Sequence, residues 1–131
     1  AETARVEVSS FLDLVLVWNK GVSYGLFQQD SMVGRWLLVA FSCVVAGCLI
    51  VWLLRSTSQL VALSLGLIIG GAFGNALDRA IFGAVIDLFS FHAYDFYWYV
   101  FNLADAAIVA GAAGLIYDSL FTSNKSAAND E

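Results

Sequence analysis

The sequence contains no proline, a single histidine and only two cysteines in 131 residues. Without proline, none of its helices is predicted to bend at a proline kink. A lone histidine, His92, argues against a metal centre that combines several His and Cys ligands. Cys43 and Cys48 stand five residues apart in one apolar run, where a helix points them in different directions. We therefore expect no disulfide and predict that both thiols are lipid-facing or packing residues, because free cysteine behaves as a small apolar side chain.

Charged side chains are also scarce, at 13% of residues, about half the share of a typical soluble domain. The net charge is −5 and the six basic residues form no stripe, so no nucleic-acid partner is expected. Apolar residues make up 60% of the chain, and the mean hydropathy is +0.80. This profile predicts a membrane protein with several spans, and the length fits one domain.

Three segments are long and apolar enough to cross a bilayer, which takes about 20 residues. We expect transmembrane helices at about residues 33–54, 60–77 and 97–121. The remaining residues are predicted to form an extracytoplasmic strand and turn (1–32), an extracytoplasmic loop (78–96) and a polar tail (122–131). The predicted fold is mainly α: a small transmembrane helix bundle, three spans visible, with a small extracytoplasmic β element.

The β element is expected in residues 11–19, FLDLVLVWN, whose strand-forming residues partly alternate in polarity. Gly21 and Gly25 follow and predict a turn. Unpaired strand edges cannot face lipid, so this strand should lie outside the hydrocarbon and pair with residues 85–91, VIDLFSF. His92, which follows that stretch, is expected to be a loop residue.

Small residues recur along the second and third predicted spans. Gly66, Gly70 and Gly74 stand every four residues on the second, and Ala107 and Gly111 show the same spacing on the third. Small side chains at this spacing let two helix backbones approach closely in lipid. We therefore predict that the second and third spans form a tight pair.

Polar residues gather at one end of these two spans, although an ionisable group at the centre of a membrane helix costs about 2.5–3.5 kcal/mol. Asn75 shares a helical face with Asp78 and Arg79, three and four residues further on. Asn102 and Asp105 repeat the three-residue spacing. Stability alone would not gather these groups at one membrane face, so we expect a site there. Asp78 and Arg79 also fit a simple interfacial ion pair that ends the helix.

Asp87 and Asp105 are the candidate catalytic pair, because neither belongs to an evident ion pair along a helix. Two carboxylates that meet in a poorly hydrated site share a proton. One can then act as general base on a water while the other donates to a substrate carbonyl. The structural alternative for each aspartate is a helix cap or a solvated loop carboxylate, and spacing alone leaves it open.

Four sequence blocks resemble those of the signal peptidase II family, and they occur in the family's order across residues 14–108. They are LVLVWNKGVSYGLF, GGAFGNALDR, VIDLF and FNLADAAI. Two positions depart from the family's usual phenylalanine, with Leu88 after the first candidate aspartate and Tyr24 in the earliest block. Members usually have four spans, and the one not seen here would precede Ala1. We therefore expect a truncated, processed or remodelled version of the family's chain.

The resemblance implies an aspartyl endopeptidase, with Asp87 and Asp105 as the catalytic dyad and no cofactor. Such an enzyme removes signal peptides from lipid-modified bacterial prolipoproteins. The implied partners are a diacylglyceryl-modified prolipoprotein, membrane lipid and globomycin-type inhibitors. The implied location is the bacterial inner membrane, with the active site toward the periplasm. The positions that the family uses to shape the site or hold substrate are Asn19, Gly21, Gly71, Asn75, Arg79, Asn102 and Ala104.

Two other functions stay open. A protein that conducts protons or ions would use the same aspartates, but it needs polar groups throughout the membrane depth, and here they cluster at one face. A non-catalytic assembly partner would instead dock through its small-residue helix faces. Its function would survive the replacement of Asp87 and Asp105 by asparagine.

Overall fold

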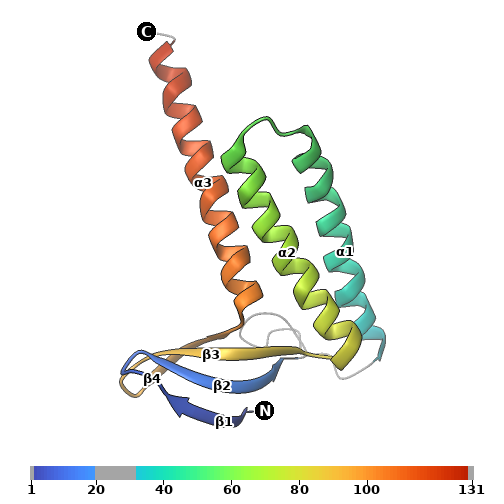
Figure 1. Ribbon diagram of the computed structural model, residues 1–131, viewed down its shortest axis with the longest axis vertical. Helices are drawn as coiled ribbons and strands as arrows, with labels where there is room; N and C mark the ends of the chain where they lie inside the picture. Colours follow the sequence, from blue (N-terminus) through green and yellow to red (C-terminus); the bar gives the residue numbers. More distant parts are fainter. Residues whose placement is uncertain (1, 20–31, 130–131) are drawn as a thin grey trace.

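Three long helices lie side by side above a four-stranded sheet in the computed structural model, which describes residues 2–19 and 32–129 (Figure 1). α2 lies between α1 and α3, and the sheet crosses the end of the bundle where α2 ends and α3 begins (Figure 1). The elements are, in order, β1 (Glu2–Glu7), β2 (Leu12–Asn19), α1 (Met32–Arg55), α2 (Gln59–Phe82), β3 (Val85–Ala93), β4 (Phe96–Phe101) and α3 (Leu103–Asn129).

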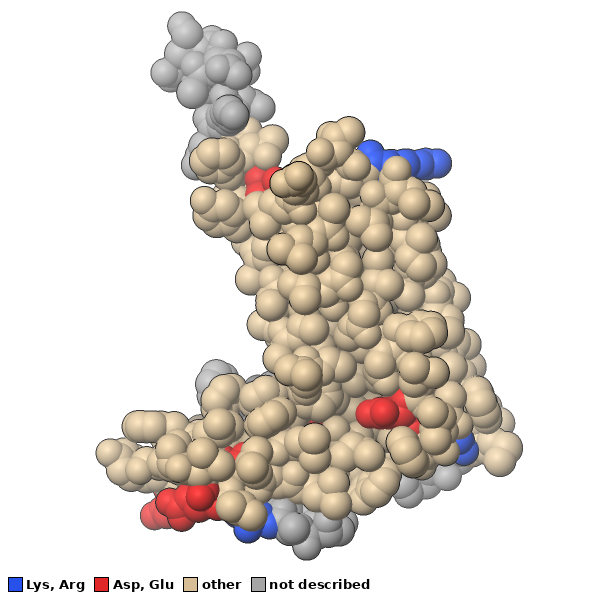
Figure 2. Space-filling model, viewed as in Figure 1, with Lys and Arg blue, Asp and Glu red and all other residues tan. Residues whose placement is uncertain are grey.

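Within the described ranges, three helices are long and apolar enough to cross a bilayer: Met32–Arg55, Gln59–Phe82 and the Leu103–Thr122 part of α3. Large apolar side chains on them point outward, as at Leu54 and Leu63, which suits contact with lipid. On the face shown in Figure 2, charged atoms lie toward the two ends and an uncharged band separates them. The predicted fold class, a small helical membrane bundle with a β element, is confirmed.

The bounds of the second and third helices differ from those predicted. α2 continues past residue 77 to Phe82 and ends at Gly83, whose φ of 77° lets its N–H reach the Arg79 carbonyl at 2.9 Å. α3 begins at Leu103 and not at residue 97, because residues 96–101 pair with β3 as strand β4. An apolar aromatic stretch such as FYWYVF suits a membrane helix and a strand equally, so only the pairing distinguishes them.

The sheet is antiparallel throughout, with strand order β1-β2-β3-β4. The predicted pairing of the N-terminal strand with the VIDLFSF stretch is confirmed, since β2 pairs with β3. Asp13 is opposite Ser90 and Val17 is opposite Asp87, with a register shift between Leu14 and Val17. This pairing holds the strand that carries Asp87 inside the sheet, and the same strand contacts α2.

The two faces of β3 differ, because successive residues of a strand point to opposite sides. Asp87 and Phe89 share the face that looks toward the helices, where Asp87 contacts the start of α3. His92 lies on the other face, is buried and reaches Asp13 of β2. The expectation of a loop at His92 is wrong, because the strand continues through it and pairs it with Tyr97 of β4.

α2 and α3 pack closely, as the small residues predicted. A Cβ atom added to Gly71 of α2 would lie 2.5 Å from the Ala104 carbonyl oxygen of α3. A Cβ atom added to Gly111 of α3 would collide with the Ser64 carbonyl oxygen of α2. These glycines are where the two backbones touch, and a larger residue would force them apart.

The predicted glycine stripe on α2 is only partly correct. Added Cβ atoms at Gly66 and Gly70 would meet nothing within 4 Å, and at Gly74 the nearest atom is the Ala104 Cβ at 3.7 Å. A four-residue step turns about 40° further than one full helical turn, so a stripe with this spacing drifts around the helix. The contact face passes through Gly71 instead.

We predict that Gly111→Ala lowers the free energy of unfolding by about 1–3 kcal/mol, because the new methyl group overpacks the contact with α2. Unfolding in detergent micelles, followed by circular dichroism against a denaturing detergent, measures the change. Gly66→Ala is the matched control: its methyl group meets open space, so stability should stay the same or rise slightly. Equal losses in both variants would contradict the packing described here.

Candidate active site

The start of α3 is a reciprocal cap made by two candidate site residues. The Asn102 Oδ1 accepts the backbone N–H of Asp105 at 2.8 Å, and the Asp105 Oδ2 accepts the backbone N–H of Asn102 at 3.3 Å. This capping box satisfies two backbone donors that a helix start leaves without partners. It also holds the Asp105 carboxylate at the positive end of the α3 dipole, which favours a negative charge there. Asp105 is therefore a helix cap and, in addition, part of a larger cluster.

Two asparagine amides join the Asp87 and Asp105 carboxylates into one hydrogen-bonded cluster. The Asn102 Nδ2 donates to Asp87 Oδ1 and to Asn75 Oδ1, both at 3.1 Å. The Asn75 Nδ2 donates to Asp105 Oδ1 at 3.2 Å. Asp87 is 2% exposed, Asn102 6% and Asn75 9%, whereas Asp105 is half-buried, so water can reach the cluster only from the side of Asp105. β3, α2 and α3 each contribute to it, and we call these four residues the acid–amide cluster.

Arg79 supplies positive charge beside this cluster. It is buried, at 7% exposed, and its guanidinium is attracted by Asp105, Asp87 and Asp78. A cation near two carboxylates offsets their mutual repulsion and lets them stay close in a poorly hydrated place. Arg79 therefore belongs to the site, and Asp105 and Asp87 act on its charge more strongly than the neighbouring Asp78 does.

Arg35 is a contributor that the sequence pattern did not single out. Its guanidinium donates from Nε to the Arg79 carbonyl at 2.6 Å and from Nη2 to the Ala80 carbonyl at 2.5 Å. A cation at a helix C-terminus binds the last carbonyls, one of which, that of Arg79, also accepts the Gly83 N–H, and it interacts favourably with the helix dipole. The signal for it was a lone basic residue in the first apolar run, which in a membrane needs a partner.

A cleft of about 230 Å³ opens beside the acid–amide cluster, between the three helices. α1 lines one side with apolar side chains, among them Leu38 and Phe41. α2 and α3 line the other side with the polar side chains of Asn75, Arg79 and Asp105. The cleft therefore combines an apolar wall, suited to a lipid or an apolar peptide, with a polar floor.

Gly71 and Ala104 position the site through the backbone. The close approach of Gly71 to the Ala104 carbonyl sets the distance between α2 and the first turn of α3. Asn75 lies one turn after Gly71, and Asp105 directly follows Ala104. The contact between two small residues thus brings the Asn75 amide to the Asp105 carboxylate.

The structure brings together six of the predicted site positions around the two helices and β3. Asn19 lies in β2, where it is the register partner of Val85, and Gly21 lies outside the described residues. In residues 2–19 and 32–129, no three His, Cys, Asp or Glu side chains come close enough to hold a metal ion. The six predicted site positions that lie together where α2, α3 and β3 meet are Asp87, Asp105, Asn75, Asn102, Gly71 and Ala104, and Arg79 lies beside them.

The fold and the cluster define an integral membrane protein with a polar site where its helices meet the sheet. Residues 1–121 match the family described as Signal peptidase (SPase) II. A lipoprotein signal peptidase of Methylorubrum extorquens (strain PA1) is 60% identical over 113 residues, which cover 86% of this chain and 66% of that protein. One from Methylobacterium sp. (strain 4-46) is 54% identical over 117 residues, covering 89% and 71%.

A solved structure of a bacterial membrane enzyme superposes with a TM-score of 0.80 at 25% identity, covering 93% of this chain and 74% of that one. Another bacterial membrane enzyme shares the fold with a TM-score of 0.74. The chain belongs to the signal peptidase II family. It spans about two thirds of the length of the first curated relatives that it matches.

We predict that Asn75 and Asn102 stabilise the fold cooperatively. Asn102→Ala removes the donor to Asp87 and to Asn75, so it should lower the free energy of unfolding by about 1–3 kcal/mol. Asn75→Ala should act through the same cluster, so the double variant should lose less than the sum of the two single losses. A double-mutant cycle in detergent measures this coupling, which we expect to be about 0.5–3 kcal/mol. Simple additivity would show that the amides act separately.

Proposed function

We propose that this protein is an aspartyl endopeptidase that removes signal peptides from lipid-modified bacterial prolipoproteins, with water activated between Asp87 and Asp105. The observation that carries the proposal is the largely buried hydrogen-bonded cluster that joins the two carboxylates through Asn75 and Asn102. Family membership and relatives named lipoprotein signal peptidase support the same activity. The chemistry needs only a water and two acids that share a proton.

The environment of the two acids suggests how their roles divide. Asp87 is almost fully buried, whereas Asp105 lines the cleft at the N-terminal end of α3, where it accepts hydrogen bonds from Asn75 and from the Asn102 backbone and faces an incoming substrate. Asp105 therefore serves as the base that takes a proton from the water. Asp87 then carries the shared proton and donates it to the scissile carbonyl as the tetrahedral intermediate forms.

The cleft fits a substrate that is anchored in lipid. Its apolar α1 wall is continuous with the lipid-facing surface of the bundle, while its floor reaches Asp105 and Arg79. A peptide held by acyl chains in the bilayer would enter along this wall and present its peptide bond at the depth of the carboxylates. Globomycin-type peptides would compete for the same cleft.

The rival functions fit the arrangement less well. A proton or ion path needs polar groups along the helices, whereas the acid–amide cluster lies where the helices meet the sheet. An assembly partner needs no shared cluster of buried carboxylates, which is costly in a stable fold. The peptidase proposal accounts for both features.

We predict that Asp87→Asn and Asp105→Asn each lower kcat by about 10²–10⁴-fold, because an amide can neither take up nor deliver the required proton. The measurement is cleavage of a diacylglyceryl-modified prolipoprotein peptide in micelles. KM should change little, since substrate binding depends on the cleft and the lipid.

Asp118→Asn is the matched control, because Asp118 lies on the same helix as Asp105, about 20 Å further along its axis. It should retain wild-type turnover. Circular dichroism and gel filtration establish that the variants fold. If a folded Asp87→Asn or Asp105→Asn protein cleaves at the wild-type rate, the two carboxylates are not the catalytic pair.

The proposed location is the bacterial inner membrane, with the sheet and the active site on the periplasmic side. The chain offers a test, because Asp95 lies in the β3–β4 turn and Thr57 in the α1–α2 turn, at opposite ends of the bundle (Figure 1). With Cys43 and Cys48 replaced by alanine, Asp95→Cys should react with a membrane-impermeant maleimide in cells whose outer membrane is permeabilised. Thr57→Cys should react only after the inner membrane is broken, and the reverse pattern would invert the topology.

A further inference from the structure

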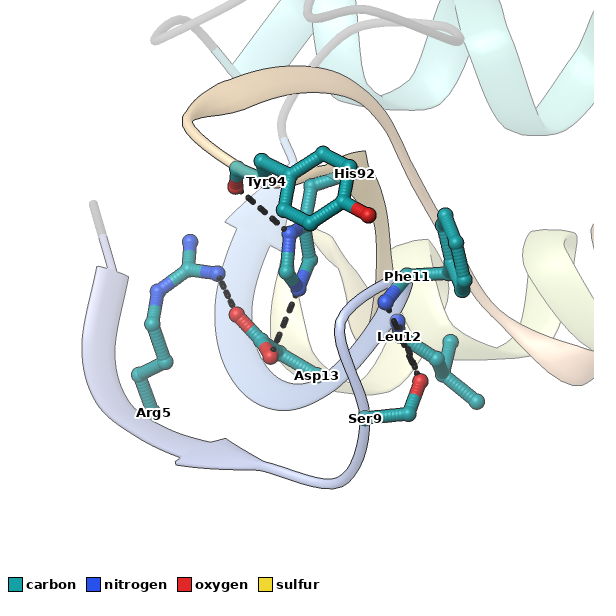
Figure 3. Close-up of polar contacts among 7 residues, drawn as sticks. All are labelled: Arg5, Ser9, Phe11, Leu12, Asp13, His92 and Tyr94. Atoms are coloured by element: carbon teal, nitrogen blue, oxygen red, sulfur yellow. Dashed lines mark hydrogen bonds and ion pairs between the residues drawn. The ribbon is translucent and has the colours of Figure 1, made fainter.

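His92 lies on the face of the sheet opposite Asp87. There it is the centre of an ion cluster with Asp13 and Arg5 (Figure 3). Its Nε2 lies 2.9 Å from the Asp13 Oδ1, and its Nδ1 lies 2.9 Å from the Tyr94 carbonyl oxygen. The other oxygen of Asp13 accepts from the Arg5 guanidinium. Only 5% of the His92 side chain and 2% of the Asp13 side chain are exposed.

The partners of the ring decide its protonation state. A carbonyl oxygen can only accept, so the Tyr94 carbonyl requires a proton on Nδ1. A carboxylate that already accepts from Arg5 likewise requires a proton on Nε2. The imidazolium is thus the form of His92 that makes both contacts with Asp13 ionised, whereas the neutral ring loses one of them.

The same contacts hold a strained turn and three strands together. Tyr94 has a φ of 53°, a left-handed conformation that side chains other than glycine adopt at a cost. Its carbonyl is bound by the His92 ring and its N–H donates to the Ser10 carbonyl. Around this turn, the His92 N–H donates to the Phe11 carbonyl, and the Ser9 hydroxyl accepts the N–H groups of Phe11 and Leu12 (Figure 3).

We propose that His92 stays protonated in the folded protein and acts as a charge lock that ties the β3–β4 turn to β1 and β2. While the imidazolium persists, Asp13 bridges two cations, one from β1 and one from β3. When the ring loses its proton, one hydrogen bond and one ion pair disappear from a buried site, and the sheet loosens around Tyr94. This device is separate from the acid–amide cluster.

The charged and titratable groups around the ring favour this state. Burial opposes the charge on His92, but the Tyr94 carbonyl, Asp13 and Glu7 outweigh it and raise the pKa of His92 above its ordinary value of 6.5. Burial likewise opposes the charge on Asp13, but Arg5 and His92 outweigh it and lower its pKa below 3.8. The groups that face the ring or share its pocket are Arg5 and Glu7 of β1, Asp13 of β2, Tyr94 and Asp95 of the turn, and Tyr97 of β4, whose ring stacks on His92.

These directions set the pH window of the lock. A raised pKa in the folded state means that the contribution of His92 is complete below about pH 6.5 and is lost as the pH rises through the higher folded value. A lowered pKa at Asp13 means that its contribution is complete above about pH 3.8 and is lost in stronger acid. The contacts of the His92 ring with Asp13 and the Tyr94 carbonyl are therefore complete in mild acid and are lost as the pH rises above the folded-state pKa of His92.

The single histidine of the chain makes a direct test possible, because a histidine-selective NMR spectrum reports on His92 alone. We expect the ¹⁵N shifts of both ring nitrogens in the folded, tag-free protein to show the imidazolium at pH 6.5, with a midpoint above that value. Asp13→Asn should lower the midpoint, while Asp95→Asn, in the exposed turn, should shift it less. A neutral ring at pH 6.5 in the wild-type protein would overturn the proposal, whether or not the variants fold.

The second measurement is the melting temperature of the full chain between pH 6 and pH 9. The wild-type protein should lose several degrees across this range, and His92→Gln should melt lower at pH 6 and show a flatter profile. Parallel profiles for the two proteins would contradict a lock that depends on protonation.

A third measurement asks whether the lock positions Asp87, which shares β3 with His92; this link alone rests on the proposed function. We expect the kcat of the wild-type protein to fall on the alkaline side more steeply than that of His92→Gln, with KM nearly unchanged. If the kcat values of the two proteins fall equally as the pH rises, the protonation of His92 does not affect the position of Asp87. Failure of the peptidase proposal would appear separately, as full activity in Asp87→Asn, and would leave the NMR and melting results untouched.

Discussion

The structure depends on the need to give every buried carboxylate a donor at a membrane boundary. Asp87 is buried away from water and Asp105 is half-buried, so both carboxylates take hydrogen bonds from within the protein. Asn102 and Asn75 meet this need because an amide both donates and accepts hydrogen bonds. Asn102 donates to Asp87 and to Asn75, and Asn75 in turn donates to Asp105. Two acids that would otherwise repel each other are thereby held in one cluster beside Arg79.

Close backbone packing makes this cluster possible. Asn75 and Asp105 belong to different helices, and their contact at 3.2 Å requires α2 and α3 to approach at Gly71 and Ala104. In lipid there is no hydrophobic force between helices, so such an approach depends on small residues that let the backbones touch. Packing along the bundle and chemistry at its end are therefore parts of one arrangement.

The sheet supplies the third side of the site, and its β3 strand carries functional side chains on both faces. One face of β3 presents Asp87 to the helices, and the opposite face buries His92 against Asp13. A strand can do this because its side chains alternate between faces. The same β3 thus joins the acid–amide cluster to a second, oppositely directed ion cluster.

Much was determined by the sequence alone: three apolar runs, the strand in residues 11–19 and the gathering of acids and amides at one end of the spans. Helices and strands are visible in the sequence because each has its own hydrophobic period. The site is visible because charged groups in membrane helices are costly and so stand out. Only the tertiary structure decided that residues 96–101 form β4, that Gly71 and not Gly66 is the contact, and that Arg35 caps α2. It also placed His92 in a strand beside Asp13, 79 residues away in the chain. These outcomes depend on which distant segments meet, and local patterns do not encode that choice.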